Sequence, residues 1–170
     1  HNEVEEIQRI DLPKEFITLT GHHRAMATTP ALNYLQNRGV TEQDILHWKI
    51  GCCMSGDYNN RVIIPSFDED GYVNYFVART FNGSWRKYLN PPASKDIIFN
   101  ELYLDFDKDL VIVEGIFDAI IAGPNSVPIL GSTLRENSKL FQQIVKNDTP
   151  VYTGLDVDAE RKTKKIIKDL

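Results

Sequence analysis

The sequence predicts an α/β protein in which a mixed α+β part is followed by a βα unit with parallel strands. Segments typical of antiparallel strands fill the middle of the chain, whereas from residue 110 onward short apolar runs alternate with helical segments. Strands that are separated by helices imply a parallel sheet with right-handed crossovers. A chain of 170 residues is long enough for one substantial domain or for two small lobes that share a core.

The first part begins with a polar stretch of about 28 residues, interrupted by Pro13, that is expected to be a linker or a peripheral arm. A helix follows and is predicted to end at Gly39, which suits the left-handed residue past a helix end. Thr41 with Asp44 three residues later resembles a capping box and opens a second helix. The first helix is expected to bury Ala31, Leu32, Tyr34 and Leu35.

An antiparallel hairpin is predicted next, because residues 61–65 and 72–79 flank the strong turn signal at 68–71. Asn82 and Gly83 mark another turn. In the second part, strands are expected at residues 110–113, 127–130 and 151–155, and helices at 116–122, 134–146 and 159–170.

The composition argues against two classes of protein, those that coat nucleic acid by bulk electrostatics and those that span a membrane. The apolar fraction of 42% and the charged fraction of 25% are ordinary for a globular protein, and the net charge of −5 argues against coating nucleic acid by bulk electrostatics. An enzyme acting on nucleic acid can still be acidic overall, because only one groove has to be basic. No segment has the ~20 apolar residues of a membrane span and no signal-peptide pattern is present, so we expect a soluble, cytoplasmic protein without membrane partners.

The cysteines and histidines do not predict a metal site. Cys52 and Cys53 are adjacent, so in a strand they point to opposite faces and are expected to be reduced thiols. His22 and His23 form a pair without a third ligand nearby, which indicates a surface loop.

Carboxylates follow two strands of the predicted parallel sheet. Glu114 comes directly after the first strand, Asp156 and Asp158 follow the third, and Asp118 lies one helical turn beyond Glu114. In an open parallel sheet, ligands bind beyond the carboxyl ends of the strands. Converging carboxylates repel one another unless a divalent cation joins them, and oxygen ligands favour Mg²⁺ or Mn²⁺. Alternatively, Glu114 is a simple strand exit and Asp156 with Asp158 caps the last helix.

These segments resemble Toprim domains. Residues 113–118 are similar to the Glu-Gly-x-x-Asp signature of that family, and residues 155–158 to its Asp-x-Asp signature. Toprim domains occur in primases, type IA and type II topoisomerases, some nucleases and recombination proteins. The upstream sequence resembles DnaG-type primases of bacteria and bacteriophages, with matching segments in the family's order at 34–41, 50–51, 61–65, 70–71, 78–79, 87–91, 102–103 and 130–132.

The resemblance implies synthesis of short RNA primers on single-stranded DNA from ribonucleoside triphosphates. Glu114 would be the central catalytic acid, Asp156 and Asp158 would hold Mg²⁺ (with Mn²⁺ as a substitute), and Asp118 would support them. A replicative helicase is the implied partner, through regions outside this chain. The residues implied to line the template and nucleotide groove are Arg61, Arg79, Lys87, Tyr88 and Asn90.

The resemblance also implies a domain plan: an arm at 1–28, the N-terminal basic lobe of a primase core at 29–104, and a Toprim domain at 105–170 that is truncated at its C-terminal end. The sequence departs from the family pattern after Asp158 and at Asn100 and Glu101, where a basic residue is expected. The family's zinc-binding module does not precede His1, so an excised core with an incomplete catalytic set is expected.

Three other functions remain open. A Toprim nuclease would keep the metal but would cleave DNA without a need for triphosphates. A non-catalytic module would bind single-stranded DNA or a helicase, with the acids serving as caps and no dependence on metal. A topoisomerase is the least favoured, since its tyrosine nucleophile would belong to a separate region and the 87–91 stretch fits primases better.

Overall fold

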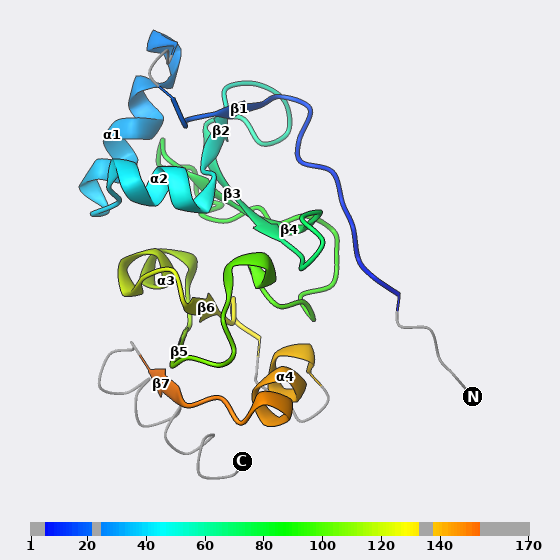
Figure 1. Cartoon of the computed structure of the whole chain (residues 1–170). Helices are drawn as coiled ribbons and strands as arrows, with labels where there is room; N and C mark the ends of the chain where they lie inside the picture. The colour runs from blue at the N-terminus through cyan, green and yellow to red at the C-terminus, as the bar shows by residue number, and fades with distance from the viewer. Residues whose placement is uncertain (1–5, 22–24, 133–137, 154–170) are drawn as a thin grey trace.

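The computed structural model describes residues 6–21, 25–132 and 138–153 and contains two β-sheets, one above the other in the view of Figure 1. The upper sheet is antiparallel, has the strand order β1-β2-β3-β4 and comprises Phe16–Thr18, Gly51–Cys53, Arg61–Phe67 and Val73–Thr80. The lower sheet is parallel, has the order β6-β5-β7 and comprises Ser126–Pro128, Leu110–Val113 and Val151–Thr153. The predicted α/β class is therefore confirmed.

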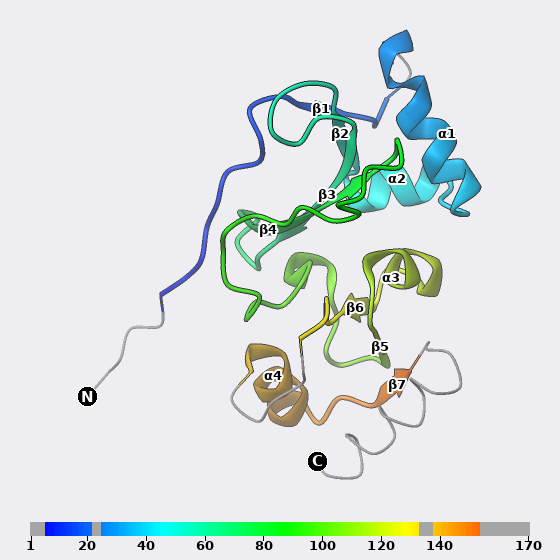
Figure 2. The ribbon, with the colours of Figure 1, turned by 180° about the vertical axis from the view of Figure 1, so that it is seen from behind.

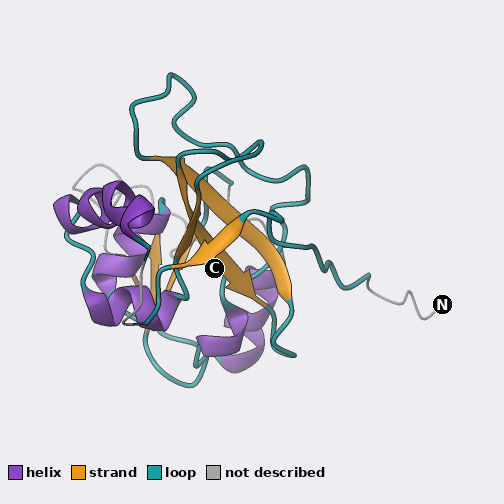
Figure 3. Cartoon of the chain, turned by 90° about the horizontal axis from the view of Figure 1, so that it is seen from above, coloured by secondary structure: helices purple, strands orange, loops and turns teal. Residues whose placement is uncertain are grey.

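Four α-helices in the described residues accompany these sheets, and Figure 1 shows α1 and α2 beside the antiparallel sheet and α3 and α4 around the parallel one. Figure 3 shows the helices (purple) and strands (orange) from above. Their bounds are Thr29–Asn37 for α1, Glu42–Trp48 for α2, Ile116–Ala122 for α3 and Lys139–Asn147 for α4. Two 3₁₀ turns lie at Met26–Thr28 and Glu101–Tyr103. In the described ranges, no helix is long and apolar enough to cross a membrane.

The predicted helical hairpin forms as expected. Gly39 follows α1 with a φ of +82°, a backbone conformation that favours glycine. At the start of α2, the Asp44 amide donates to Thr41 Oγ1 at 3.1 Å and the Thr41 amide donates to Asp44 Oδ2 at 2.9 Å. This capping box satisfies two amides that the helix itself leaves unpaired, and it confirms the predicted start of the helix.

The predicted β-hairpin is β3 and β4, and its turn is built around Asp68. The Oδ1 atom of Asp68 accepts from the amides of Asp70 and Tyr72 at 2.9 and 3.0 Å, and Gly71 takes a φ of +87°. The stretch before residue 29, expected to be an arm, contributes the edge strand β1 through antiparallel pairing with β2.

Both faces of the antiparallel sheet are covered. Cys52 belongs to the large core that includes Val62 and Val77, whereas Cys53 packs with Ile63 and Phe76 in a smaller cluster. Adjacent residues in β2 therefore point to opposite faces, as predicted. Both cysteines are buried free thiols, which confirms that prediction as well.

The parallel sheet differs from the prediction at its edges. Strand β6 ends at Pro128 rather than residue 130, because Leu130 and Gly131 have φ values of +55° and +76° and turn the chain out of the sheet. Helix α4 begins at Lys139, where the Ser138 side chain accepts from the Phe141 amide at 3.2 Å. The predicted helix start at residue 134 and the predicted helix at 159–170 lie outside the described residues.

A continuous apolar core joins the two sheets. It contains Leu35 of α1 and Ile112 of β5, both almost fully buried. At the junction of α1 and α3, the rings of Tyr34 and Phe117 meet edge to face with centroids 6.0 Å apart, and the Arg38 guanidinium lies 4.2 Å from the Phe117 centroid. The shared core fixes the parallel sheet and the antiparallel sheet relative to each other.

Candidate functional site

Glu114 lies at the carboxyl end of β5, the central strand of the parallel sheet, and its side chain is exposed. Gly115 then caps α3, and the exposed Asp118 lies in the first turn of that helix. The Asp118 Oδ2 atom lies 3.6 Å from the point that a Cβ atom on Gly115 would occupy. The Asp118 carboxylate therefore returns toward the strand exit, and the two acids predicted from the sequence lie at the same end of the strand.

Backbone hydrogen bonds fix this strand exit. The Leu130 amide donates to the Glu114 carbonyl and the Ile129 amide donates to the Val113 carbonyl, both at 2.9 Å. On the other side of β5, Ile112 pairs with Thr153, the last residue of β7, so the parallel strands β5 and β7 end at the same edge. Asp156 and Asp158, the other two predicted acids, lie outside the described residues.

The donor chemistry fits a divalent cation in part. Glu114 and Asp118 offer hard carboxylate oxygens, the ligands that Mg²⁺ and Mn²⁺ prefer. Within residues 6–21, 25–132 and 138–153, no three His, Cys, Asp or Glu side chains come together as a complete metal-binding group. Glu114 and Asp118 are two acids of the right chemistry at this strand exit, fewer than the three that such a group needs.

A second group of predicted residues lies on the antiparallel sheet, around the segment that follows β4. Arg61 is only 6% exposed; its Nη1 atom donates to the Lys87 carbonyl at 3.1 Å and its Nη2 atom donates to the Arg86 carbonyl at 2.7 Å. Burial lowers the pKa of the Arg61 guanidinium, and the positive charges of Arg86 and Arg79 lower it further. Arg61 thus anchors the 86–87 backbone.

Arg79 and Tyr88 form an antiparallel bridge, and the Arg79 Cζ atom lies 5.0 Å from the Tyr88 ring centroid. Lys87 is exposed and Tyr88 is 41% exposed, so both reach solvent. The Nε atom of Arg79 and the Oδ1 atom of Asn90 are buried without a hydrogen-bond partner in the described part of the chain. The structure therefore pairs Arg79 with Tyr88 and ties Arg61 to the backbone of Arg86 and Lys87, and Asn90 follows Tyr88 by two residues.

Trp85 and Arg86 also belong to this surface, although the sequence prediction did not include them. Both are exposed, and the Arg86 guanidinium lies 5.7 Å from the Trp85 ring centroid. The signal available in the sequence was an aromatic residue directly before two basic residues, just after the Asn82-Gly83 turn.

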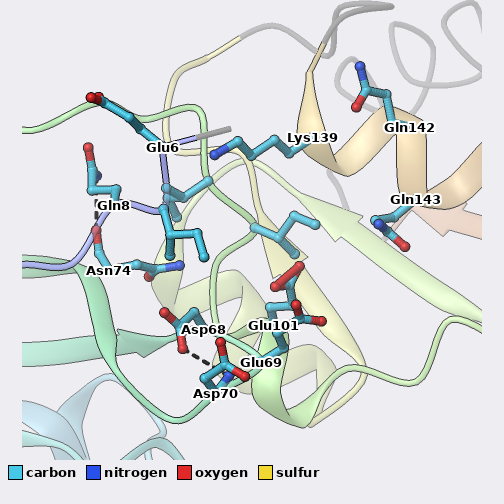
Figure 4. Close-up of a pocket in the computed structure, with 13 residues that line it drawn as sticks. Glu6, Gln8, Asp68, Glu69, Asp70, Asn74, Glu101, Lys139, Gln142 and Gln143 are labelled. Atoms are coloured by element: carbon cyan, nitrogen blue, oxygen red, sulfur yellow. Dashed lines mark hydrogen bonds between the residues drawn. The ribbon is translucent and has the colours of Figure 1, made fainter. Parts of the chain in front are cut away.

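An acidic cavity of about 170 Å³, shown in Figure 4, was likewise not predicted. It lies between the β3–β4 turn and α4, and its lining includes Asp68, Glu69, Glu101 and Lys139. Burial raises the pKa of the Glu101 carboxyl, and the nearby charge of Glu69 raises it further. None of the site residues predicted from the sequence lines this cavity.

Comparison with known proteins gives these features a context. No protein-family model matches the chain. It is 31% identical to the DNA primase of Clostridium acetobutylicum over 131 residues, covering 66% of this chain and 22% of that protein. It is 33% identical to the DNA primase of Synechococcus elongatus over 118 residues, covering 61% of this chain and 17% of that protein. The chain therefore spans well under half the length of the curated relatives it matches.

Solved structures show the same fold. The zinc-binding and RNA polymerase domains of the Aquifex aeolicus primase align with a TM-score of 0.64 and 22% identity, over 81% of this chain and 45% of that one. A DnaG primase catalytic domain bound to single-stranded DNA aligns with a TM-score of 0.60 and 19% identity, over 76% of this chain and 56% of that one. The fold is that of a primase catalytic core. The resemblance to DnaG-type DNA primases is confirmed, because the chain is also related in sequence to DNA primases of several bacteria.

Proposed function

We propose that this chain is the catalytic core of a DNA primase, a nucleotidyltransferase that makes short RNA primers on single-stranded DNA from ribonucleoside triphosphates. The observation that carries the proposal is the position of Glu114, exposed at the end of the central parallel strand, in a fold shared with DnaG catalytic cores. The sequence relation to DNA primases supports the same reaction.

The carboxylates would carry the chemistry. Glu114 would be the central acid, either as a metal ligand or as the base near the attacking 3′-hydroxyl, and Asp118 would support it from the first turn of α3. Asp156 and Asp158 would complete the ligand set. A bound Mg²⁺ would stabilise charge on the transferring phosphoryl group and would lower the pKa of the attacking hydroxyl.

The cationic surface, formed by Arg79, Lys87 and Tyr88 beside the antiparallel sheet, would hold the template and the incoming nucleotide. Arg79 and Lys87 are suited to phosphate contacts, and the half-exposed ring of Tyr88 is suited to stacking on a base. Asn90 would add a polar contact. Arg61 would act as a positioning residue, because its guanidinium donates to the carbonyls of the segment that presents Lys87.

The proposal keeps the domain plan of an arm at 1–28, a basic lobe at 29–104 and a Toprim domain at 105–170. We expect the protein to act in the cytoplasm of a bacterial cell or of a phage-infected cell, where its DNA template is found. A replicative helicase is the proposed partner, through regions outside this chain.

A primer-synthesis assay tests the proposal. The chain is incubated with single-stranded DNA, labelled ribonucleoside triphosphates and Mg²⁺ or Mn²⁺. Short RNA products that require the metal and disappear in Glu114→Gln would support the primase function. Metal-dependent cleavage of the DNA without triphosphates would favour a nuclease instead, and metal-independent binding without any reaction would favour a non-catalytic module.

A further inference from the structure

Trp85 has an unusual environment for a large aromatic side chain. It is 88% exposed, whereas Trp48, the other tryptophan, is 2% exposed in the core. A single exposed apolar residue is common on protein surfaces and by itself indicates nothing. What distinguishes Trp85 is its neighbours in the sequence, because the exposed cations Arg86 and Lys87 follow it directly.

The segment that carries these side chains is held by hydrogen bonds to its backbone. The Thr80 amide donates to the Lys87 carbonyl and the Leu89 amide donates to the Ala78 carbonyl, both at 3.0 Å. The buried Arg61 guanidinium adds bonds to the carbonyls of Arg86 and Lys87. The backbone beside Trp85 is therefore held in place before any ligand arrives, which reduces the entropy lost on binding. Figure 2 shows the chain after β4 crossing in front of the antiparallel sheet.

The charge of this surface is not neutralised locally. In the part of the chain that the structure describes, the ion pairs join Arg9 to Asp68 and Asp70, and Lys108 to Asp105. None of them involves the cations around Trp85, where the guanidinium of Arg61 experiences the like charges of Arg79 and Arg86. Cations on a fixed backbone, without ion pairs among the described residues and next to an exposed aromatic face, are complementary to a chain that alternates phosphates with unstacked bases.

We propose that Trp85 is a stacking platform for an unpaired base of single-stranded DNA, with Arg86 and Lys87 contacting the adjacent phosphates. The inference rests on the proposed function in one respect, the single-stranded template as the ligand. It adds a base contact to the surface of Arg79, Lys87 and Tyr88. A duplex keeps its base faces stacked, so Trp85 distinguishes unpaired from paired DNA.

Intrinsic fluorescence tests this directly, because the buried Trp48 leaves Trp85 as the solvent-accessible tryptophan. An oligothymidine is titrated into the whole chain, with an abasic oligomer of equal length and a duplex as controls. The oligothymidine is expected to quench the emission, whereas the abasic oligomer and the duplex are not. Binding without quenching, or equal quenching by all three ligands, would overturn the inference.

Variants separate stacking from charge, with affinity measured by the anisotropy of a labelled oligonucleotide. Trp85→Leu is expected to weaken oligothymidine binding by about tenfold or more, and Trp85→Phe is expected to retain most of the affinity. Arg86→Gln is expected to lower the slope of log affinity against log salt by about 1, whereas Trp85→Leu leaves that slope unchanged. Unchanged affinity in Trp85→Leu, or no binding by the parent chain, would overturn the stacking role.

The outcomes also distinguish this inference from the proposed function. Quenching and base-dependent binding without primer synthesis would leave the stacking platform intact and remove the primase assignment. Primer synthesis and affinity that are both unaffected by Trp85→Leu would support the primase assignment and remove the stacking platform. Melting temperature serves as the fold control, and no loss is expected because the Trp85 side chain is exposed.

Discussion

The two sheets of this molecule carry different kinds of candidate site, a cationic surface on one and exposed acids on the other. In the antiparallel sheet, β3 and β4 are seven and eight residues long, and the cationic surface beside them is tied to the backbone by Arg61. In the parallel sheet, the strands have three or four residues, and Glu114 and Asp118 are exposed beyond the end of β5. Substitution of the buried anchor Arg61 should therefore change stability and nucleic-acid affinity together, whereas substitution of the exposed acids Glu114 and Asp118 should change chemistry alone.

The largest effect is expected from Glu114→Gln, which keeps the size of the side chain and removes its charge. Primer synthesis should fall by about a hundredfold or more, because a carboxylate at the reacting centre is lost. The melting temperature should stay unchanged, since the side chain is exposed and outside the core. A loss of stability that accompanies the loss of activity would contradict the proposed separation between the two sheets.

Arg61→Met should affect the cationic surface beside the antiparallel sheet. Removing the guanidinium leaves the Arg86 and Lys87 carbonyls without its hydrogen bonds, and we expect unfolding in urea to show a loss of about 2 kcal/mol. Oligonucleotide affinity should fall as well, because Lys87 and Trp85 lose their fixed support. Arg61→Lys provides the matched control and should restore only part of both losses.

Thr41→Ala tests a stabilising contact that has no expected role in the chemistry. Loss of the cap on α2 should lower the free energy of unfolding by about 1 kcal/mol, whereas Thr41→Ser should retain most of it. Metal-dependent activity, measured well below the melting temperature, should match that of the parent. Reduced activity in a folded Thr41→Ala chain would show that α2 contributes more than support.

The smallest effect at neutral pH is expected from the two buried thiols. Burial raises the pKa of Cys52 to about 11 and that of Cys53 to about 12. Because the folded-state pKa exceeds the ordinary value near 9, the native state favours the protonated thiols, and their contribution is fully present below pH 9. Stability should then fall as the pH rises from about 9 to 12, and less steeply in Cys53→Ala. Rapid alkylation of the folded chain at pH 8 would contradict this burial.

Local signals predicted most of the fold. The capping pair Thr41 and Asp44, the turn around Gly71 and the position of Glu114 at a strand end all depend on neighbouring residues, and each was visible in the sequence. The end of β6 was misplaced, because the positive φ of Leu130 depends on how the chain leaves the sheet and not on the residue type. The anchoring role of Arg61 was hidden as well, since its partners lie 25 and 26 residues away in the sequence.

In the candidate site too, the sequence did not reveal burial or contacts between distant segments. Residue types and spacing indicated the carboxylates, and the resemblance to primases implied most of the cations, but neither separated the buried Arg61 from the exposed Lys87. The acidic cavity between the β3–β4 turn and α4 depends on segments far apart in the sequence and had no local signal. Exposure was also needed to distinguish Trp85 from Trp48.

Calorimetric titration of Mn²⁺ with a ribonucleoside triphosphate tests the central claim most directly. The parent chain should bind the pair, and Glu114→Gln and Asp156→Asn should lose that binding while keeping the parent's melting temperature. Equal binding by the parent and both variants would contradict the claim that these carboxylates form the catalytic centre of a primase core.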